Sequence, residues 1–103
     1  MTILKEEDRY RLLKLLAENP TLNQRQMAEA LNVSLGRVNC WVKNLTDRGW
    51  LVWRPAPGGR GNYLLTSAGK REKRAVRQQC LAKKQRDYAQ LRREIEQLKQ
   101  ELL

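Results

Sequence analysis

The sequence has 103 residues, and its 21 basic and 11 acidic side chains give it a net charge of +10. This length predicts one small domain with at most a short appendage, and the charge favours a polyanionic partner such as nucleic acid. No apolar run approaches the ~20 residues of a membrane-spanning helix, and no secretory signal is recognisable. We therefore expect a cytoplasmic protein with no membrane partner.

Residues suited to catalysis or metal binding are scarce. The sequence contains no histidine, and Cys40 and Cys80 have neither metal-binding nor redox spacing. We find no nucleophile with a nearby base and no phosphate-binding loop. The sequence thus predicts no enzyme activity, no metal and no cofactor.

The first predicted helix runs from about Lys5 to Asn19, because Pro20 cannot continue it. Its apolar stripe is wider than packing on a single helical hairpin requires. The excess could cover the C-terminal helix of the same chain or of a partner chain. The stripe consists of Tyr10, Leu12, Leu13, Leu15 and Leu16.

Residues 23–49 predict two helices joined by a short turn. Asn23 and Gln26 form a capping-box pattern, and Asn32 tolerates the left-handed conformation that ends a helix. Ser34 is a favourable cap for the next helix, and Gly49 ends it. A tight turn between two closely crossing helices is typical of a helix-turn-helix. An ordinary helical hairpin with a solvated polar face is the alternative.

The second of these helices has two different faces at about 100° per residue. Leu35, Val38, Val42 and Leu45 fall on one side, with Trp41 at its edge. The opposite side is polar, and Arg, Lys and Asn side chains there suit the base edges of a DNA major groove. Asn44 suits adenine, Arg37 and Lys43 suit guanine or phosphate, and Ser34 suits a phosphate at the helix start. The predicted DNA-contacting set on this helix is Ser34, Arg37, Asn39, Cys40, Lys43 and Asn44.

Residues 50–54 and 62–65 are rich in aromatic and β-branched side chains, which predicts two strands. The turn-rich segment 55–61 between them makes a β-hairpin, and a hairpin directly after the reading helix is a wing. We expect Trp50 and Trp53 to pack on the helices. Arg54, Arg60 and Asn62 are the predicted DNA contacts of the wing, with Arg60 placed at its tip for phosphate or a minor groove.

Several stretches of the chain together resemble a known family. The sequence is similar to the small MarR-type winged-helix regulators associated with exopolysaccharide gene clusters in bacteria. This resemblance implies a dimeric transcriptional regulator with 35–48 as its recognition helix, 50–65 as its wing, and a link to polysaccharide production. MarR-type proteins often bind small aromatic effectors, but we identify no such pocket from the sequence. The resemblance rests on residues 8–16 and 34–39, on Lys43 and Gly49-Trp50, and on residues 63–66 with Gly69.

The sequence departs from that family pattern at three positions. Lys5 stands where a capping Thr is common, and Ser67 stands where a Pro is frequent. Cys40 replaces an aromatic residue on the outward face of the recognition helix, so the preferred base sequence cannot be carried over from the family.

A last helix is predicted from Thr66 or Ser67 to the end of the chain. From residue 81 onward it shows a heptad, with Lys84 as a polar exception, which predicts self-association. Charges at the flanking e and g positions favour two parallel strands; packing on the first helix, in the same or another chain, is the alternative. The predicted dimerisation residues are Leu81, Tyr88, Leu91, Ile95, Leu98 and Leu102.

Positive charge is unevenly distributed along the chain. Residues 1–34 have no net charge, residues 35–66 have +4, residues 67–86 have +7, and residues 87–103 have −1. Evenly solvated surfaces mix the two signs more closely. The excess on the reading helix, the wing and the helix after them favours a nucleic-acid partner.

These observations predict a mostly α-helical fold with a small β-hairpin wing. We expect a winged helix-turn-helix DNA-binding domain at 1–66 and a basic, partly coiled-coil dimerisation helix at 67–103. The predicted function is sequence-specific transcriptional regulation by a homodimer bound to double-stranded DNA. A protein-binding winged-helix adaptor and a non-specific architectural DNA-binding protein are the alternatives.

Overall fold

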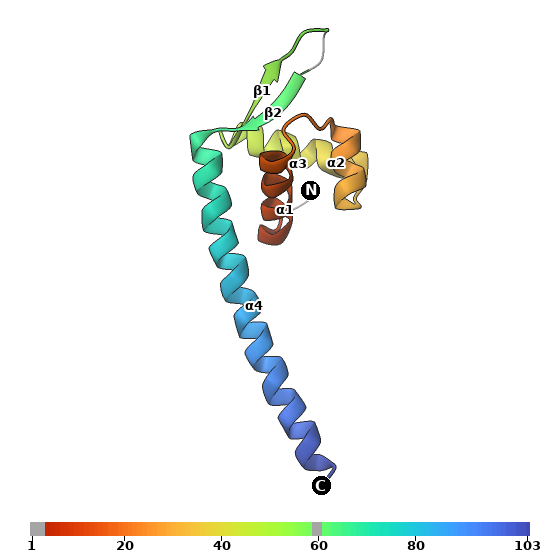
Figure 1. Cartoon of the computed structure of the whole chain (residues 1–103), viewed down its shortest axis with the longest axis vertical. Coiled ribbons are helices and arrows are strands. Elements are labelled where there is room, and N and C mark those ends of the chain that lie inside the picture. Colours follow the sequence, from red (N-terminus) through yellow and green to blue (C-terminus); the bar gives the residue numbers. More distant parts are fainter. Residues whose placement is uncertain (1–3, 59–60) are drawn as a thin grey trace.

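The computed structural model describes residues 4–58 and 61–103 and confirms the mostly helical fold with one hairpin (Figure 1). Three short helices come first and are followed by two antiparallel strands and one long helix. The elements are α1 (Glu6–Glu18), α2 (Gln24–Leu31), α3 (Leu35–Asp47), β1 (Leu51–Pro55), β2 (Gly61–Leu65) and α4 (Ser67–Glu101). Within this part of the chain, no helix is long and apolar enough to cross a membrane.

The turn between α2 and α3 has the predicted capping residues. The Asn23 side chain accepts a hydrogen bond from Gln26 N at 2.8 Å, and Gln26 Oε1 accepts one from Asn23 N at 3.0 Å. Asn32 ends α2 at φ +56°, and Ser34 Oγ accepts from Arg37 N at 3.1 Å to begin α3. These bonds satisfy the free backbone N–H groups at both helix starts, which fixes where each helix begins.

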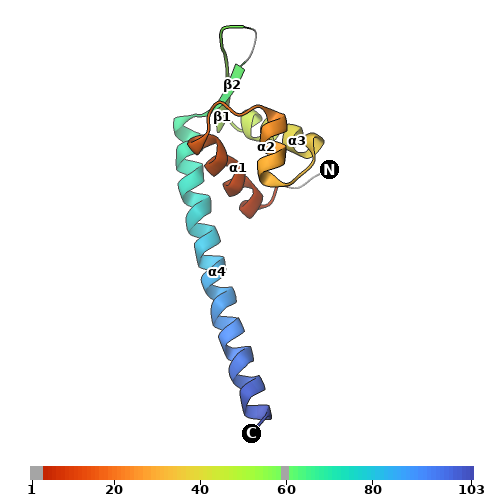
Figure 2. The ribbon, with the colours of Figure 1, turned by 45° about the vertical axis from the view of Figure 1, so that its right-hand side comes forward.

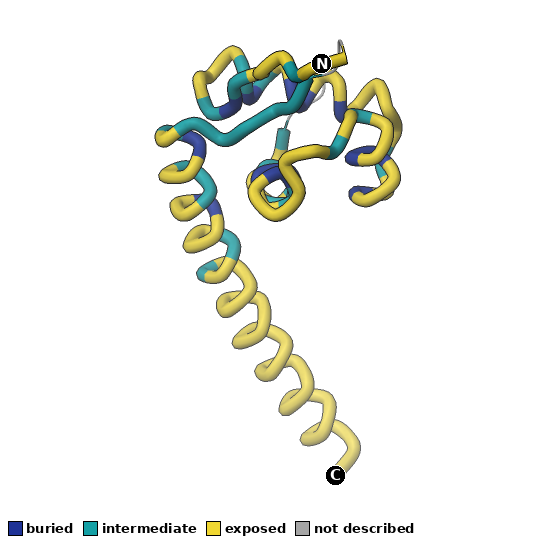
Figure 3. The backbone as a smooth tube through the Cα atoms, turned by 45° about the horizontal axis from the view of Figure 1, so that its top comes forward, coloured by how far each residue is buried: buried dark blue, intermediate teal, exposed yellow. Residues whose placement is uncertain are grey.

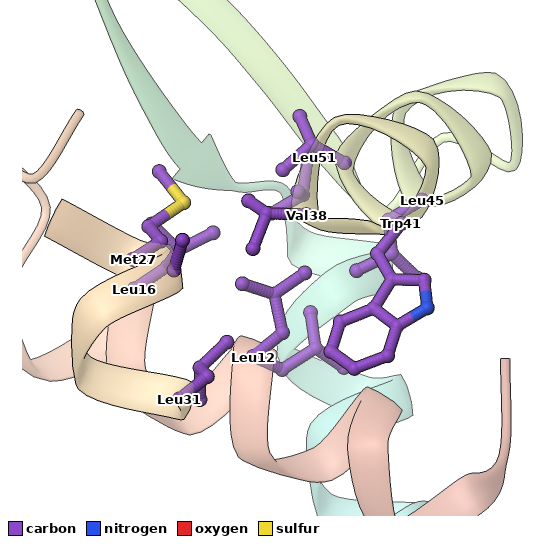
Figure 4. Close-up of a cluster of buried hydrophobic side chains, with 11 residues drawn as sticks. Leu12, Leu16, Met27, Leu31, Val38, Trp41, Leu45 and Leu51 are labelled. Carbon is purple, nitrogen blue, oxygen red and sulfur yellow. The ribbon is translucent and has the colours of Figure 1, made fainter. Parts of the chain in front are cut away.

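The core lies between α1, α2, α3 and the start of β1 (Figure 4). Trp41, predicted at the edge of the apolar face of α3, is only 3% exposed and belongs to this core. Leu35, predicted on the same side of the helix as Val38, Val42 and Leu45, is 46% exposed. The physical reason is that Leu35 lies in the first turn of α3, where the start of α2 covers it only in part. The fully or nearly buried side chains include Leu12, Leu13, Leu16, Met27, Leu31, Val38, Val42, Leu45 and Leu51.

The hairpin projects away from the helices at the end of the molecule opposite the C-terminus (Figures 1 and 2). Leu51 pairs with Leu65, and Trp53 pairs with Tyr63, so these four side chains share the face that begins in the core. Trp53 is nevertheless 47% exposed, and its ring covers Gly61 on the opposite strand. The prediction that Trp53 packs on the helices is therefore wrong, because the strand has already left the core at this residue.

A tight junction joins the hairpin to α4. Thr66 Oγ1 donates to the carbonyl of Gly49 at 2.6 Å and accepts from Gly69 N at 3.0 Å, so Thr66 rather than Ser67 caps the helix. Gly69 is buried against the backbone of Trp50, where any side chain would overlap the Trp50 carbonyl oxygen. A glycine in the first turn, unfavourable for helix formation by itself, is explained by this close approach.

The long helix α4 is packed along its first half only. It lies against α1 and β2, with Val76 fully buried and Arg9 Nε of α1 3.2 Å from Glu72 Oε1. Beyond residue 82 every side chain of α4 is exposed (Figure 3). The radius of gyration is 18.0 Å, against about 13 Å for a compact chain of this length. Packing of α4 on α1 in the same chain, one of the predicted alternatives, is thus confirmed for its first half.

Candidate nucleic-acid interface

The outward face of α3 is the first part of the candidate interface. Val38, Val42 and Leu45 hold this helix against the core, so the residues between them point to solvent. Arg37 and Lys43 are exposed, and Asn39 and Cys40 are exposed beside them. The structure therefore leaves two cations, an amide and a thiol open to a ligand along about two turns of helix.

Two predicted members of this face are more constrained. Asn44 is only partly exposed, and its Oδ1 is buried without a hydrogen-bond partner among the described residues. Pairing with adenine through both amide atoms needs that oxygen to be free. The Ser34 side chain is exposed, but its Oγ already accepts the helix-capping bond from Arg37 N. Its hydroxyl hydrogen can still be donated to an anion at the helix start.

Residues of α2 extend the same surface, although nothing in the sequence pattern indicates this. Asn23, Gln24 and Arg25 at the start of α2 line a shallow depression together with Leu35 and Asn39 of α3. The exposed Leu35 adds an apolar group, the kind of side chain that contacts a thymine methyl in a major groove. Only the crossing of α2 over α3 brings these residues together.

The hairpin supplies the second part of the candidate interface. Arg54 is exposed and stands directly opposite Asn62, which is half-buried, so both side chains lie on one face of the strands. This is the face opposite Trp53 and Tyr63. The third predicted wing residue, Arg60, lies outside the described residues.

Positive charge on α3 and on the described part of the hairpin has no ion-pair partner among the described residues. The ion pairs among residues 4–58 and 61–103 join Arg9 to Glu72, Arg11 to Asp8, Lys84 to Glu7, and Lys99 to Glu96. None of them involves α3 or either strand. The cations of this face are therefore free to attract an anionic ligand.

A third cationic surface lies where α4 passes β2 and the end of α1. Leu16, Leu64 and Leu65 belong to the apolar lining of a cavity of about 500 Å³ there. Four basic side chains of α4 line the same cavity, and the part of the chain that the structure describes offers none of them an ion-pair partner. These side chains are Lys70, Lys73, Arg74 and Arg77.

Two arginines, Arg9 and Arg48, lie against the indole ring of Trp50. The guanidinium carbon of Arg48 lies 5.2 Å from the centre of the Trp50 ring, and that of Arg9 lies 5.4 Å from it. Such contacts stabilise the ring and the cations together. Trp50 thus packs on the helices as predicted, and it holds the end of α3 close to α1.

Comparison with known families supports this geometry. Residues 9–52 match a family described as winged helix-turn-helix DNA-binding. That segment covers most of α1, all of α2 and α3, and the beginning of β1. The fold is a winged helix-turn-helix. The hairpin β1–β2 is its wing, and α3 occupies the place of its recognition helix.

Solved structures similar to this winged helix are MarR-family regulators. A MarR-family transcriptional regulator from Rhodococcus sp. RHA1 is 23% identical, with a TM-score of 0.68, over 78% of this chain and 58% of that one. MarR from E. coli in its apo form is 22% identical, with a TM-score of 0.61, over 68% of this chain and 53% of that one.

A third similar structure is Sco5413, a MarR-family transcriptional regulator from Streptomyces coelicolor. It is 28% identical, with a TM-score of 0.61, over 72% of this chain and 53% of that one. The chain thus spans between half and three-fifths of the length of these regulators. A search of curated protein sequences gave no match.

Proposed function

We propose that this protein is a MarR-type transcriptional regulator that binds specific sequences of double-stranded DNA as a homodimer. One observation carries the proposal: α3 of a winged helix-turn-helix presents an exposed cationic face without ion pairs among the described residues. That face suits a major groove, whose base edges accept and donate hydrogen bonds in a sequence-dependent pattern.

The proposed contacts divide into reading and positioning groups. Arg37 and Lys43 pair with guanine or with phosphate, and the exposed amide of Asn39 is better placed for adenine than that of Asn44. On the wing, Arg54 and Arg60 bind phosphates or a narrow minor groove. Cys40, Asn62 and Ser34 complete the proposed set, with Ser34 donating to a phosphate at the start of α3.

A homodimer on DNA predicts a two-fold symmetric site. Half-sites would lie about 34–36 Å apart, or at a multiple of that distance, so that both recognition helices enter the same side of the duplex. We further propose that the regulated genes concern exopolysaccharide production and that the protein acts in the bacterial cytoplasm. Sequence resemblance supports the link to exopolysaccharide, and the presence of DNA in that compartment supports the location.

The proposal is tested by selecting bound duplexes from a random DNA pool with the full chain and then titrating the winner against salt. We expect an inverted repeat, an affinity well above that for random DNA, and a steep loss of affinity with salt. A steep salt dependence without sequence preference would instead show an architectural DNA-binding protein. Absence of binding at low salt would leave a protein-binding adaptor.

Two substitutions separate reading from positioning. Asn39→Ala should change which base is preferred at one position of each half-site, whereas Arg60→Ala should weaken all duplexes alike and lower the salt slope by about one. Arg93→Ala removes a comparable charge far from α3 and serves as the control. Uniform weakening by both Asn39→Ala and Arg60→Ala would contradict the assigned roles.

A further inference from the structure

Leu35 is an apolar side chain that the fold leaves largely uncovered. Among the described residues of the winged domain, Trp53 is the one other large apolar side chain that is exposed to the same extent. Trp53 has a packing role of its own, since its ring covers Gly61 on the opposite strand. A single exposed leucine is common on protein surfaces. The surroundings of Leu35 therefore decide whether it has a role.

These surroundings are a shallow depression between the starts of α2 and α3, which lie side by side on the part of the domain away from α4 (Figure 2). Its lining consists of Asn23, Gln24, Arg25, Leu35, Gly36 and Asn39. Leu35 is the large apolar group of this lining, and the other side chains are polar. A Cβ built on Gly36 would meet no atom within 4 Å, so the surface next to Leu35 is open. A ligand with one apolar group and polar neighbours fits this depression.

Leu35 lies on the same side of α3 as the amide proposed to read adenine. Leu35 and Asn39 are four positions apart, which places them about 40° apart around the helix and roughly 6 Å apart along it. Leu35 is also the first residue of α3, and the N-terminal residues of a recognition helix contact base edges in the major groove. Because base pairs are stacked about 3.4 Å apart, Leu35 reaches a base within about two pairs of the one at Asn39.

The chemistry of the major groove leaves one group for Leu35 to contact. Most of each base edge consists of hydrogen-bond donors and acceptors, and leucine can satisfy neither. A polar edge placed against Leu35 would lose its water without gaining a hydrogen bond, which costs affinity. The C5 methyl group of thymine is the one apolar group that the four standard bases present in this groove.

We infer that Leu35 contacts the C5 methyl group of a thymine in each half-site and makes thymine the required base at that position. The contact removes a methyl group from water, which should raise the affinity about fourfold for each half-site. This inference rests on the proposed function, because it places α3 in a major groove.

Arg25 supplies the positioning contact beside this thymine. Its side chain is exposed at the edge of the depression, and none of the ion pairs among the described residues involves it. A cation at this place binds a phosphate of the strand that borders the groove and holds the start of α2 against the duplex. The depression thus combines a sequence-independent contact through Arg25 with a base-dependent one through Leu35.

Removing the methyl group from the DNA tests the inference without changing the protein. In the duplex selected from the random pool, each thymine of one half-site is replaced in turn by deoxyuridine, which keeps every hydrogen bond and lacks the C5 methyl. We expect a loss of about fourfold at one thymine, within about two base pairs of the position whose preference changes in Asn39→Ala. Equal affinities at every position would overturn the inference.

Substitution of Leu35 identifies the side chain that senses the methyl group. Leu35→Ala should bind the thymine and deoxyuridine duplexes equally, whereas Leu35→Met keeps an apolar side chain and should still prefer thymine. Both residues favour helices and Leu35 lies outside the core, so the fold should be retained, which circular dichroism checks. A Leu35→Ala protein that keeps the fourfold preference would overturn the inference.

Arg25→Ala is the matched control from the same depression. It should weaken the thymine and deoxyuridine duplexes by the same factor and lower the salt slope by about one. The fourfold preference for thymine should persist in this variant. Loss of that preference would show that it comes from the placement of α2 rather than from contact with Leu35, and would overturn the inference.

The outcomes separate this inference from the proposed function. A protein that selects a specific sequence but does not distinguish thymine from deoxyuridine would leave the proposed regulator standing while the inference fails. A protein that selects no sequence would remove the proposed function and the thymine contact together.

Discussion

Helix α3 and the second half of α4 both carry an apolar stripe at helical spacing, but the stripe of α3 is buried and that of α4 is exposed. On α3, Val38, Trp41 and Leu45 are between 0% and 3% exposed. On α4, Leu91 and Leu98 are 54% and 61% exposed. The pattern is of the same kind, but among the described residues other elements bury the stripe of α3 and leave that of α4 exposed.

This difference shows which face of each helix is left for a partner. Because the apolar face of α3 is used inside the chain, its polar face with Arg37 and Lys43 is the surface available to an external ligand. Because the apolar face of α4 is unused, that face itself is available, and apolar surfaces favour a protein partner. One helix face is thus suited to DNA and the other to a protein partner.

The largest expected effect comes from removing one leucine from each stripe. Leu45→Ala should lower the free energy of unfolding by about 2–5 kcal/mol, because it leaves a cavity in the core. Leu91→Ala should leave the stability of the monomer nearly unchanged and weaken self-association instead. Thermal unfolding at low and high protein concentration distinguishes the two effects. Equal, concentration-independent losses would show that the α4 stripe is not an intermolecular surface.

A smaller effect is expected from adding one methyl group to a glycine of each helix. Gly69→Ala should destabilise the protein by about 1–3 kcal/mol, because the new group overlaps the Trp50 carbonyl. Gly36→Ala meets no atom within 4 Å and should stabilise α3 by about 0.5–1 kcal/mol. Denaturant unfolding measures both. Similar signs for the two substitutions would contradict the close contact between α4 and the base of the wing.

The smallest expected effect concerns the turn that orients α3. Asn32→Ala should cost about 1 kcal/mol, because alanine is strained at φ +56°. Asn32→Gly should be close to neutral, since glycine adopts this conformation freely. Chemical denaturation of the two variants, side by side, provides the measurement. A loss that is as large for glycine as for alanine would point to the side chain of Asn32 rather than its backbone.

Local features of this fold were predictable because short-range chemistry determines them. The capping box of Asn23 and Gln26, the left-handed Asn32 and the cap Ser34 each act within four residues, so the sequence displays both partners. The wing strands were predicted within one residue at each end, from their composition and the turn residues between them. The packing of Trp50 on the helices was also predictable from local composition.

Errors arose where a helix or strand extends past its neighbours. Periodicity gives the direction in which Leu35 and Trp53 point, but not whether another element lies in that direction. Leu35 stands at the first turn of α3 and Trp53 at the point where β1 leaves the core, so both are exposed. Trp41 shows the converse, since neighbouring helices bury a side chain that periodicity placed at an edge.

The order of residues along the chain is enough to place the helix starts, the polar face of α3 and the accumulation of positive charge. Packing of the folded chain is needed to show that the first half of α4 lies against α1 while its second half is exposed. It is also needed to show that Asn44 is partly buried while Arg25 and Leu35 join the α3 surface. Capping and periodicity depend on residues a few positions apart. Exposure depends on which distant elements meet, and that depends on the packing of the whole chain.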